Sequence, residues 1–209
     1  MDLVLAICQG LGLALAVGIG GPIAALFAAM MGSLKVGFNP EGTDYSFVTA
    51  TWFLVTLLAV VVIIVLARGR ELARTPVLLL LAAIGAVVFA ASLAEEGYAA
   101  WPGLIAGALV AGATAMVAGE TLDGAIARAK AAGAGRGGLG RDAGDGTTTP
   151  EADAANALVV GFTVAGVVVA ALALLVPPVS VVVAVALVAL ALGRRRTAGE
   201  KYEGLRILR

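Results

Sequence analysis

The chain has 209 residues, of which 61% are hydrophobic and only 13% are charged, and its mean hydropathy is +1.03. Soluble domains are about half apolar and about one quarter charged, so this composition excludes an ordinary soluble domain and predicts an integral membrane protein. The formal net charge is zero, so no basic surface is expected for a nucleic-acid partner.

Six apolar segments are long enough to cross a bilayer, because a helix needs about 20 residues to span a hydrocarbon core about 30 Å thick. We therefore predict an all-α helical bundle that forms one transmembrane domain over residues 1–209. The predicted spans are residues 3–31, 47–67, 76–94, 102–119, 154–176 and 179–193. Pro177 and Pro178 interrupt the last apolar stretch, and since proline cannot easily continue a helix, we place a tight turn there.

The first span contains the most distinctive local sequence. Residues 3–31 would make a helix of about 43 Å, which exceeds the apolar thickness of a bilayer. Gly20, Gly21 and Pro22 lie in its middle, where paired glycines weaken a helix and proline removes a backbone donor. Two interpretations stay open: a simple kink, or a functional break that forms a substrate or ion site. With Gln9 in the same span, these residues form the predicted binding or permeation path.

Small residues recur at every fourth position in two spans. Gly12 belongs to such a row in the first span, and Gly103, Gly107 and Gly119 belong to one in the fourth. Because lipid is as apolar as a leucine side chain, helices in a bilayer associate through close backbone approach, and small residues allow it. These rows predict helix packing within the monomer, with a homo-oligomer seam as the alternative.

The fourth and fifth spans are joined by a polar segment. Residues 131–153 are rich in glycine and predict a mobile cytoplasmic loop, at the end of which Pro150 suits the first turn of a helix. Glu120 and Asp123 lie where the fourth helix leaves the bilayer. They could line a vestibule, or they could belong to a solvated helical extension that reaches Lys130.

Basic residues are distributed asymmetrically about the six spans. Of the 14 Lys and Arg residues, only Lys35 falls on one side, and the rest fall on the other. Cytoplasmic loops of membrane proteins hold an excess of Lys and Arg, so the basic side is predicted to be cytoplasmic. With six crossings both termini are then cytoplasmic, including a basic tail at residues 194–209. Aromatic residues gather near the span ends on the other side, as in an interfacial belt: Tyr45, Trp52, Tyr98 and Trp101.

The residue types of the chain give no support for catalysis or for a bound cofactor. The chain has no His and a single Cys, so it lacks the residues of most zinc and haem sites and can form no intrachain disulfide. No charged residue lies near the middle of a span, which argues against a carboxylate-driven pump, and Ser92 has no evident catalytic partner. We expect no enzyme, no metal and no cofactor.

Three segments resemble those of a known family. The Gly-rich opening Gly10-Leu11-Gly12-Leu13-Ala14, the Gly20-Gly21-Pro22 sequence, and the tail GEKYEGLRILR at residues 199–209 resemble a family of small bacterial polytopic membrane proteins of unknown function. The resemblance implies the bacterial cytoplasmic membrane and no activity or site. The chain departs from the family in its Gly-rich insert between the fourth and fifth spans.

Two functions are compatible with these features. The first is permeation of a small solute or ion through the broken first helix. The alternative is a non-transporting scaffold or accessory subunit that binds partner helices through its Gly and Ala rows. Residues 1–95 and 102–193 each supply three predicted spans, so the two halves are also a candidate 3+3 inverted repeat, an arrangement common in transporters.

Overall fold

The computed structural model describes residues 3–66, 74–134, 150–183 and 185–186. These residues are almost entirely helical and contain no strand, which confirms the predicted all-α class. The elements in chain order are α1 (Leu3–Gly20), α2 (Pro22–Ser33), the 3-10 helix η1 (Ser46–Thr49), α3 (Thr51–Leu66), α4 (Arg74–Glu95), α5 (Trp101–Ala134) and α6 (Pro150–Leu175). Helical structure resumes after Val176, over residues 177–183 and 185–186.

Among the described residues, four helices are long and apolar enough to cross a membrane, as expected of a membrane protein. They are Leu3–Gly20, Thr75–Glu95, Trp101–Arg128 and Asn156–Leu175, while Pro22–Ser33 and Thr51–Ile64 are apolar but shorter. Two predicted spans, 76–94 and 102–119, fall within α4 and α5, and the predicted span 154–176 lies within α6 except for Val176. The predicted span 179–193 is described only as far as Ala186.

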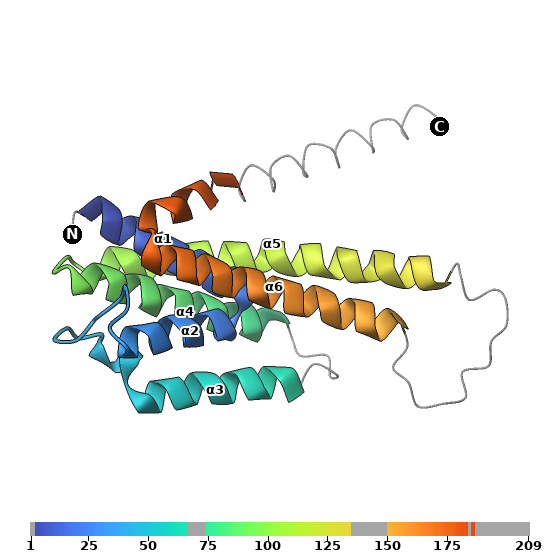
Figure 1. The fold of residues 1–209 in the computed structure, drawn as a ribbon, viewed down its shortest axis with the longest axis horizontal. Helices are drawn as coiled ribbons and strands as arrows, with labels where there is room; N and C mark the ends of the chain where they lie inside the picture. The colour runs from blue at the N-terminus through green and yellow to red at the C-terminus, as the bar shows by residue number, and fades with distance from the viewer. Residues whose placement is uncertain (1–2, 67–73, 135–149, 184, 187–209) are drawn as a thin grey trace.

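Residues 3–31 do not form the single crossing that we predicted. The helix is broken rather than kinked at Gly21, and α2 runs back beside α1 as a helical hairpin (Figure 1). The amide of Gln9 near the start of α1 donates a hydrogen bond to the carbonyl of Gly37 after α2, at 2.5 Å. In a continuous helix these residues would be about 42 Å apart. The start of α1 and Lys35 therefore lie at the same end of the bundle.

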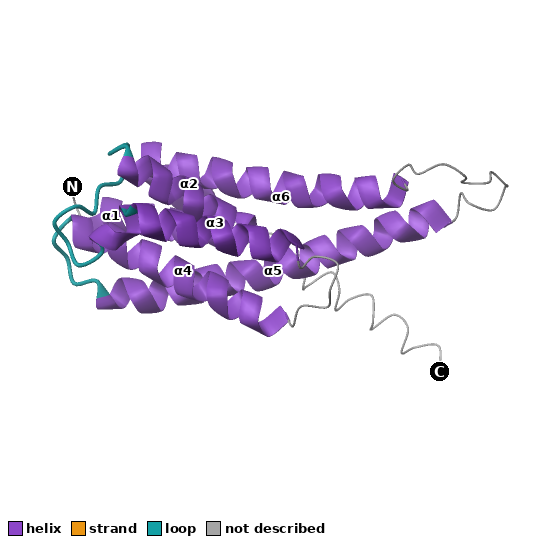
Figure 2. Ribbon diagram, turned by 90° about the horizontal axis from the view of Figure 1, so that it is seen from below, coloured by secondary structure: helices purple, strands orange, loops and turns teal. Residues whose placement is uncertain are grey.

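The bundle has two ends with different characters (Figures 1 and 2). One end holds Leu3, the loop of residues 34–50, residues 96–100 and Val176, and we call it the loop end. The opposite end holds the last turn of α3, the start of α4 with Arg74, the last turns of α5 with Arg128, and the start of α6. We call it the basic end.

The central helix is α1, which packs against α4, α5 and α6. Most of its residues are buried because small side chains let neighbouring backbones approach closely. By contrast α3 packs on α2 and η1 at the periphery, and its described part contains one buried side chain, that of Leu57. Apart from Thr51 and Thr56, the remaining described side chains of α3 are apolar, as expected for a surface in contact with lipid.

Three further expectations about the ends of helices are confirmed. Helix α5 continues to Ala134, so the helical extension that was predicted to reach Lys130 is present. Helix α6 starts at Pro150, and the predicted turn at Pro177 and Pro178 is found at Val176, where the helix stops before it resumes at Pro177.

The 3+3 repeat requires three helices from residues 1–95, but this half forms the four helices α1–α4. Among the described residues, the first half of the chain therefore does not show the three-helix arrangement that the repeat requires. The predicted loop 131–153 lies outside the described residues except at its helical ends, and the predicted tail 194–209 lies wholly outside them.

Candidate binding cavity at the hairpin tip

Three consecutive residues, Gly20, Gly21 and Pro22, form the hairpin tip, and each has a different structural role. Gly21 has φ 66° and ψ −154°, a combination that is essentially restricted to glycine. A Cβ built on Gly21 would meet no atom within 4 Å, so the backbone conformation rather than space demands glycine there. Pro22 is the first residue of α2, where its missing N–H would have no helical partner in any case. The Gly21 N–H closes α1 by donating to the carbonyl of Val17 at 2.9 Å.

Gly20 allows the tip to pack tightly against α6. A Cβ on Gly20 would lie 2.9 Å from the Cα of Gly166, and a Cβ on Gly166 would lie 2.3 Å from the Cα of Gly20. Both distances are shorter than real Cβ contacts, so both residues must be glycine for α1 and α6 to cross here. Sequence reasoning missed Gly166, although Gly166, Ala170 and Ala173 form a row of small residues at helical spacing on α6, which was the available signal.

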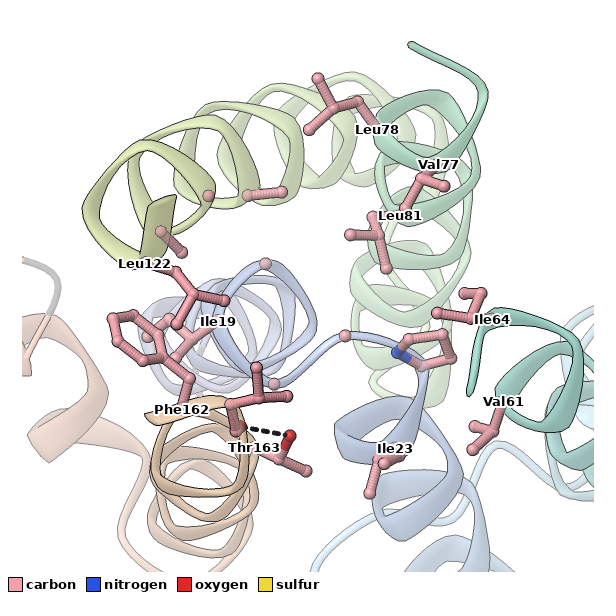
Figure 3. Close-up of a pocket in the computed structure, with 18 of the residues that line it drawn as sticks. Ile19, Ile23, Val61, Ile64, Val77, Leu78, Leu81, Leu122, Phe162 and Thr163 are labelled. Atoms are coloured by element: carbon pink, nitrogen blue, oxygen red, sulfur yellow. Dashed lines mark hydrogen bonds between the residues drawn. The ribbon is translucent and has the colours of Figure 1, made fainter. Parts of the chain in front are cut away.

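The tip borders a cavity of about 520 Å³ (Figure 3). This volume lies within the range of small-molecule sites, about 300–1,000 Å³. Helices α3, α4, α5 and α6 line the cavity together with the tip and its neighbours, so residues far apart in the sequence converge on it. The lining residues besides Gly20, Gly21 and Pro22 are Gly18, Ile19, Ile23, Val61, Ile64, Val77, Leu78, Leu81, Ala115, Ala118, Gly119, Leu122, Asp123, Val159, Phe162 and Thr163.

One face of α5 forms a wall of the cavity. Ala115, Ala118, Gly119, Leu122 and Asp123 follow one another at helical spacings of three and four residues, so they share that face. The first three are small and leave room beside α1. Asp123 is the member of this row nearest the basic end and is exposed, so it marks the mouth of the cavity. The vestibule that we considered from sequence thus includes Asp123, whereas Glu120 is not among the described lining residues.

The cavity is mostly apolar. Among its described side chains, only Asp123 is ionisable, and Thr163 carries a hydroxyl that already donates to the carbonyl of Val159 at 3.0 Å. The backbone of the tip contributes further polar atoms. A ligand would therefore meet apolar walls, one carboxylate and the ends of two helices.

The tip lies well inside the span of its neighbours. Thr163 is about 18 Å from the end of α6 at Leu175, and Leu81 is about 21 Å from the end of α4 at Glu95, at about 1.5 Å per residue. For a hydrocarbon core about 30 Å thick that begins at the loop-end termini of α4 and α6, both distances would place the tip in the half nearer the basic end. Irregular backbone at such depth is tolerated where it is buried in protein or lines a water-filled cavity, and here the broken backbone lines a cavity.

Gln9 does not belong to this site. It is 2% exposed, lies about 16 Å along α1 from Gly20, and is absent from the cavity lining. Its amide instead fastens α1 to the segment after α2 through the Gly37 carbonyl. The predicted path is therefore divided: the structure brings Gly20, Gly21 and Pro22 together at the cavity and leaves Gln9 at the loop end.

Two serines make further hydrogen bonds to α1 near the loop end. The Ser92 hydroxyl of α4 donates to the Ala6 carbonyl at 3.1 Å, and the Ser180 hydroxyl donates to the Cys8 carbonyl at 2.5 Å. Both serines are fully buried, and buried hydroxyls need a hydrogen-bond partner. The Ser180 hydroxyl oxygen also lies 2.6 Å from the carbonyl oxygen of Pro177, so the Cys8 and Pro177 carbonyls share its one proton. With Gln9 they bind the first half of α1 to three other segments and close the bundle between the cavity and the loop end.

The glycines predicted for helix packing lie at different places. A Cβ on Gly12 would lie 2.4 Å from the Cβ of Ser180. On α5, a Cβ on Gly103 would lie 2.9 Å from the Cα of Ala90, and one on Gly107 would lie 2.5 Å from the carbonyl oxygen of Gly85. These three glycines are thus at contacts inside the chain, whereas Gly119 lies on the cavity wall.

Comparison with known proteins returns no match. No protein-family model, no curated protein and no solved structure matches this chain. The family resemblance of the opening and tail segments stays a prediction.

Proposed function

We propose that the protein is a multi-pass membrane protein that binds a small solute in the cavity at the hairpin tip and conducts it across the bilayer. The observation that carries the proposal is the helix break at Gly21, whose irregular backbone forms the floor of a cavity of about 520 Å³ at bilayer depth. Broken helices that meet at a cavity are the sites where many transporters bind substrates and ions.

The proposed state is closed towards the loop end. Gln9, Ser92 and Ser180 bind α1 to its neighbours there, and the cavity mouth at Asp123 faces the basic end. Conduction would require these contacts to open, since a transporter exposes its site to one side at a time.

The proposed orientation places the basic end in the cytoplasm of a bacterial cell. Arg74 and Arg128 lie at this end, and Lys35 lies at the other, as the excess of cytoplasmic Lys and Arg requires. Because the hairpin returns α2 to the loop end, the start of α1 is then external. This replaces the prediction that both termini are cytoplasmic, and the membrane would be crossed by α3, α4, α5, α6 and the span predicted from sequence at residues 179–193, which is described only as far as Ala186.

The scaffold alternative is less well supported. It relied on small-residue rows that bind partner helices, but Gly12, Gly103 and Gly107 are engaged within the chain, where a Cβ would already collide with a neighbouring atom. The predicted homo-oligomer stays a prediction.

Flux through reconstituted protein tests the function. Proteoliposomes would be screened for uptake of rubidium, chloride, glycerol and a lipophilic cation. We expect flux of at least one solute, abolished by Gly21→Leu combined with Pro22→Ala and retained in Gly161→Leu, since Gly161 is exposed on α6 with open space around it. Equal flux in the two variants would reject the hairpin tip as the conducting site.

Cysteine labelling from each side of the membrane tests the orientation. The native Cys8 is buried, so it should stay unreactive in the folded protein. A membrane-impermeant maleimide should label Leu3→Cys and Lys35→Cys from the external side, and Glu120→Cys from the cytoplasmic side. Labelling of Leu3→Cys together with Glu120→Cys from one side would reject the hairpin topology.

A further inference from the structure

The walls of the cavity favour an apolar ligand. The side chains that line it come from four different helices and include Ile23, Val61, Leu81 and Phe162 (Figure 3). A strongly hydrated solute would lose its water shell there without replacement partners, whereas a hydrocarbon gains by leaving water.

The polar groups of the described lining are already engaged. The hydroxyl of Thr163 donates to the carbonyl of Val159 at 3.0 Å, and Asp123, which is exposed at the mouth, already interacts with another group of the chain. The tip adds the C-terminal end of α1 and the N-terminal end of α2, whose partial charges are opposite and adjacent, so they offset one another. The ligand is therefore selected by its apolar body rather than by its charge.

The wall that α5 contributes is elongated. Its lining residues run from Ala115 to Asp123, which is about 12 Å along the helix axis. The side chains of Ala115, Ala118 and Gly119 project little, so the recess that they leave beside α1 follows the axis of α5. Such a recess fits a hydrocarbon chain that lies along the helices, as the acyl chains of a bilayer do.

The packing of α3 indicates how such a chain enters. Helices α3 and α4 both line the cavity, yet among the described residues α3 packs on α2 and η1 and has little direct contact with α4. The lining residues on these two helices are apolar: Val61 and Ile64 on α3, Val77 and Leu78 on α4. Because α3 lies at the periphery of the bundle, a chain can pass from the bilayer between these helices without meeting a polar side chain of a described lining residue.

We propose that the cavity binds an acyl chain of a membrane phospholipid, which enters from the bilayer between α3 and α4 and lies along α5 with its end against the tip. This inference rests on the proposed function, because it names the substrate class of the same cavity: a lipid of the bilayer rather than a solute dissolved in water.

Photo-cross-linking in proteoliposomes tests the occupant. The probe is a phosphatidylcholine with a diazirine in one acyl chain, and mass spectrometry identifies the labelled residues. Leu81 lines the cavity and is 8% exposed, so we expect it to be labelled only if a chain enters. Leu79 is 67% exposed on the same helix, so it reports chains that stay in the bilayer. Labelling of Leu79 without Leu81 would overturn the proposal.

The same lipid with its diazirine on the headgroup tests which part of the lipid is bound. It should leave Leu81 unlabelled, because the walls near the tip offer a headgroup no free polar side chain among the described lining residues. Equal labelling of Leu81 by the two probes would overturn the assignment of the cavity to the acyl chain.

A pair of variants tests the route of entry. Val77→Trp fills the opening between α3 and α4 and should lower labelling of Leu81 by at least about tenfold, the change in affinity that corresponds to about two buried methylene groups. Ala83→Trp is the matched control, since Ala83 is exposed on α4 and is not among the described lining residues, and it should leave labelling unchanged. Protection of Cys8 from a thiol reagent would confirm that each variant is folded. Undiminished labelling of Leu81 in folded Val77→Trp would overturn the proposed entry.

These outcomes are distinct from failure of the proposed function. Labelling of Leu81 by the acyl-chain probe, without flux of any solute and without transbilayer movement of a fluorescent phospholipid, would reject transport and support the ligand class. Flux of a water-soluble solute through a protein whose Leu81 is not labelled would overturn the ligand class and support transport.

Discussion

Replacement of Gly21 by alanine should change the stability of the protein in opposite directions in a hairpin and in a continuous helix. The sign of the change therefore distinguishes the two structures. In the hairpin, residue 21 has φ 66° and ψ −154°, and a Cβ there has no atom within 4 Å. Steric overlap with neighbours is therefore absent, and the penalty is the backbone strain of a non-glycine residue, about 1–3 kcal/mol. In a continuous helix the same substitution would stabilise the protein by about 0.5–1 kcal/mol, because alanine is the better helix former.

The single cysteine provides the assay. Cys8 is 8% exposed, so a thiol-reactive dye labels it only when the protein opens. If opening and closing are fast relative to labelling, the labelling rate follows the unfolding equilibrium constant. A loss of 1–3 kcal/mol then accelerates labelling by about 5- to 150-fold. The protein would be labelled in detergent over a range of temperatures.

Gly161→Ala is the matched control for this experiment. Gly161 is a helical glycine of α6 that also has open space around it, so alanine should slow Cys8 labelling by about 2- to 5-fold. The reasoning fails if Gly21→Ala slows labelling as Gly161→Ala does, because residue 21 would then be helical and α1 would continue into α2.

Two further predictions use the same readout. Gly107→Ala should lower stability by about 1–3 kcal/mol, since its Cβ would lie 2.5 Å from the backbone carbonyl of Gly85, whereas Gly112→Ala on the same helix meets its nearest atom at 3.5 Å and should be tolerated. Equal effects of these two substitutions would contradict the described contact of α4 with α5. Gln9→Leu should lower stability by about 1–3 kcal/mol by leaving the Gly37 carbonyl without its partner, and unchanged Cys8 labelling would show that this bond contributes nothing.

The membrane class and most helices were predictable because they depend on local composition. Long apolar runs identify α4, α5 and α6, and the break at Gly21 follows from the conformational freedom of glycine and the missing donor of Pro22. The reversal of α2 was not predictable, because a Gly-Gly-Pro sequence gives the same local signal for a kink and for a turn. The reversal is shown by contacts between residues that lie far apart in the sequence: Gln9 with Gly37, and Gly20 with Gly166.

The candidate site was predictable only where the sequence itself is unusual. The tip residues stand out as a Gly-Gly-Pro sequence, but Leu81 and Phe162 are ordinary apolar residues that no local pattern selects for a cavity. Gln9 was misassigned because a polar side chain in a span suggests a path, whereas its amide satisfies a backbone carbonyl. Asp123 could be suggested only as one of two alternatives, since its place on the cavity face of α5 depends on how α5 packs.

The distribution of charge explains why the sequence does not distinguish a single first crossing from a hairpin. Residues 1–34 contain no Lys or Arg, so the positive-inside rule is insensitive to whether they cross once or return as a hairpin. In either arrangement Lys35 lies opposite the remaining basic residues, because the segments after it keep their order across the bilayer. The hairpin changes only the side on which α1 begins. An uncharged segment that enters and leaves the bilayer on the same side therefore cannot be recognised from the charges of its loops. In the proposed arrangement, the same lack of charge lets its broken backbone lie at bilayer depth beside an apolar cavity.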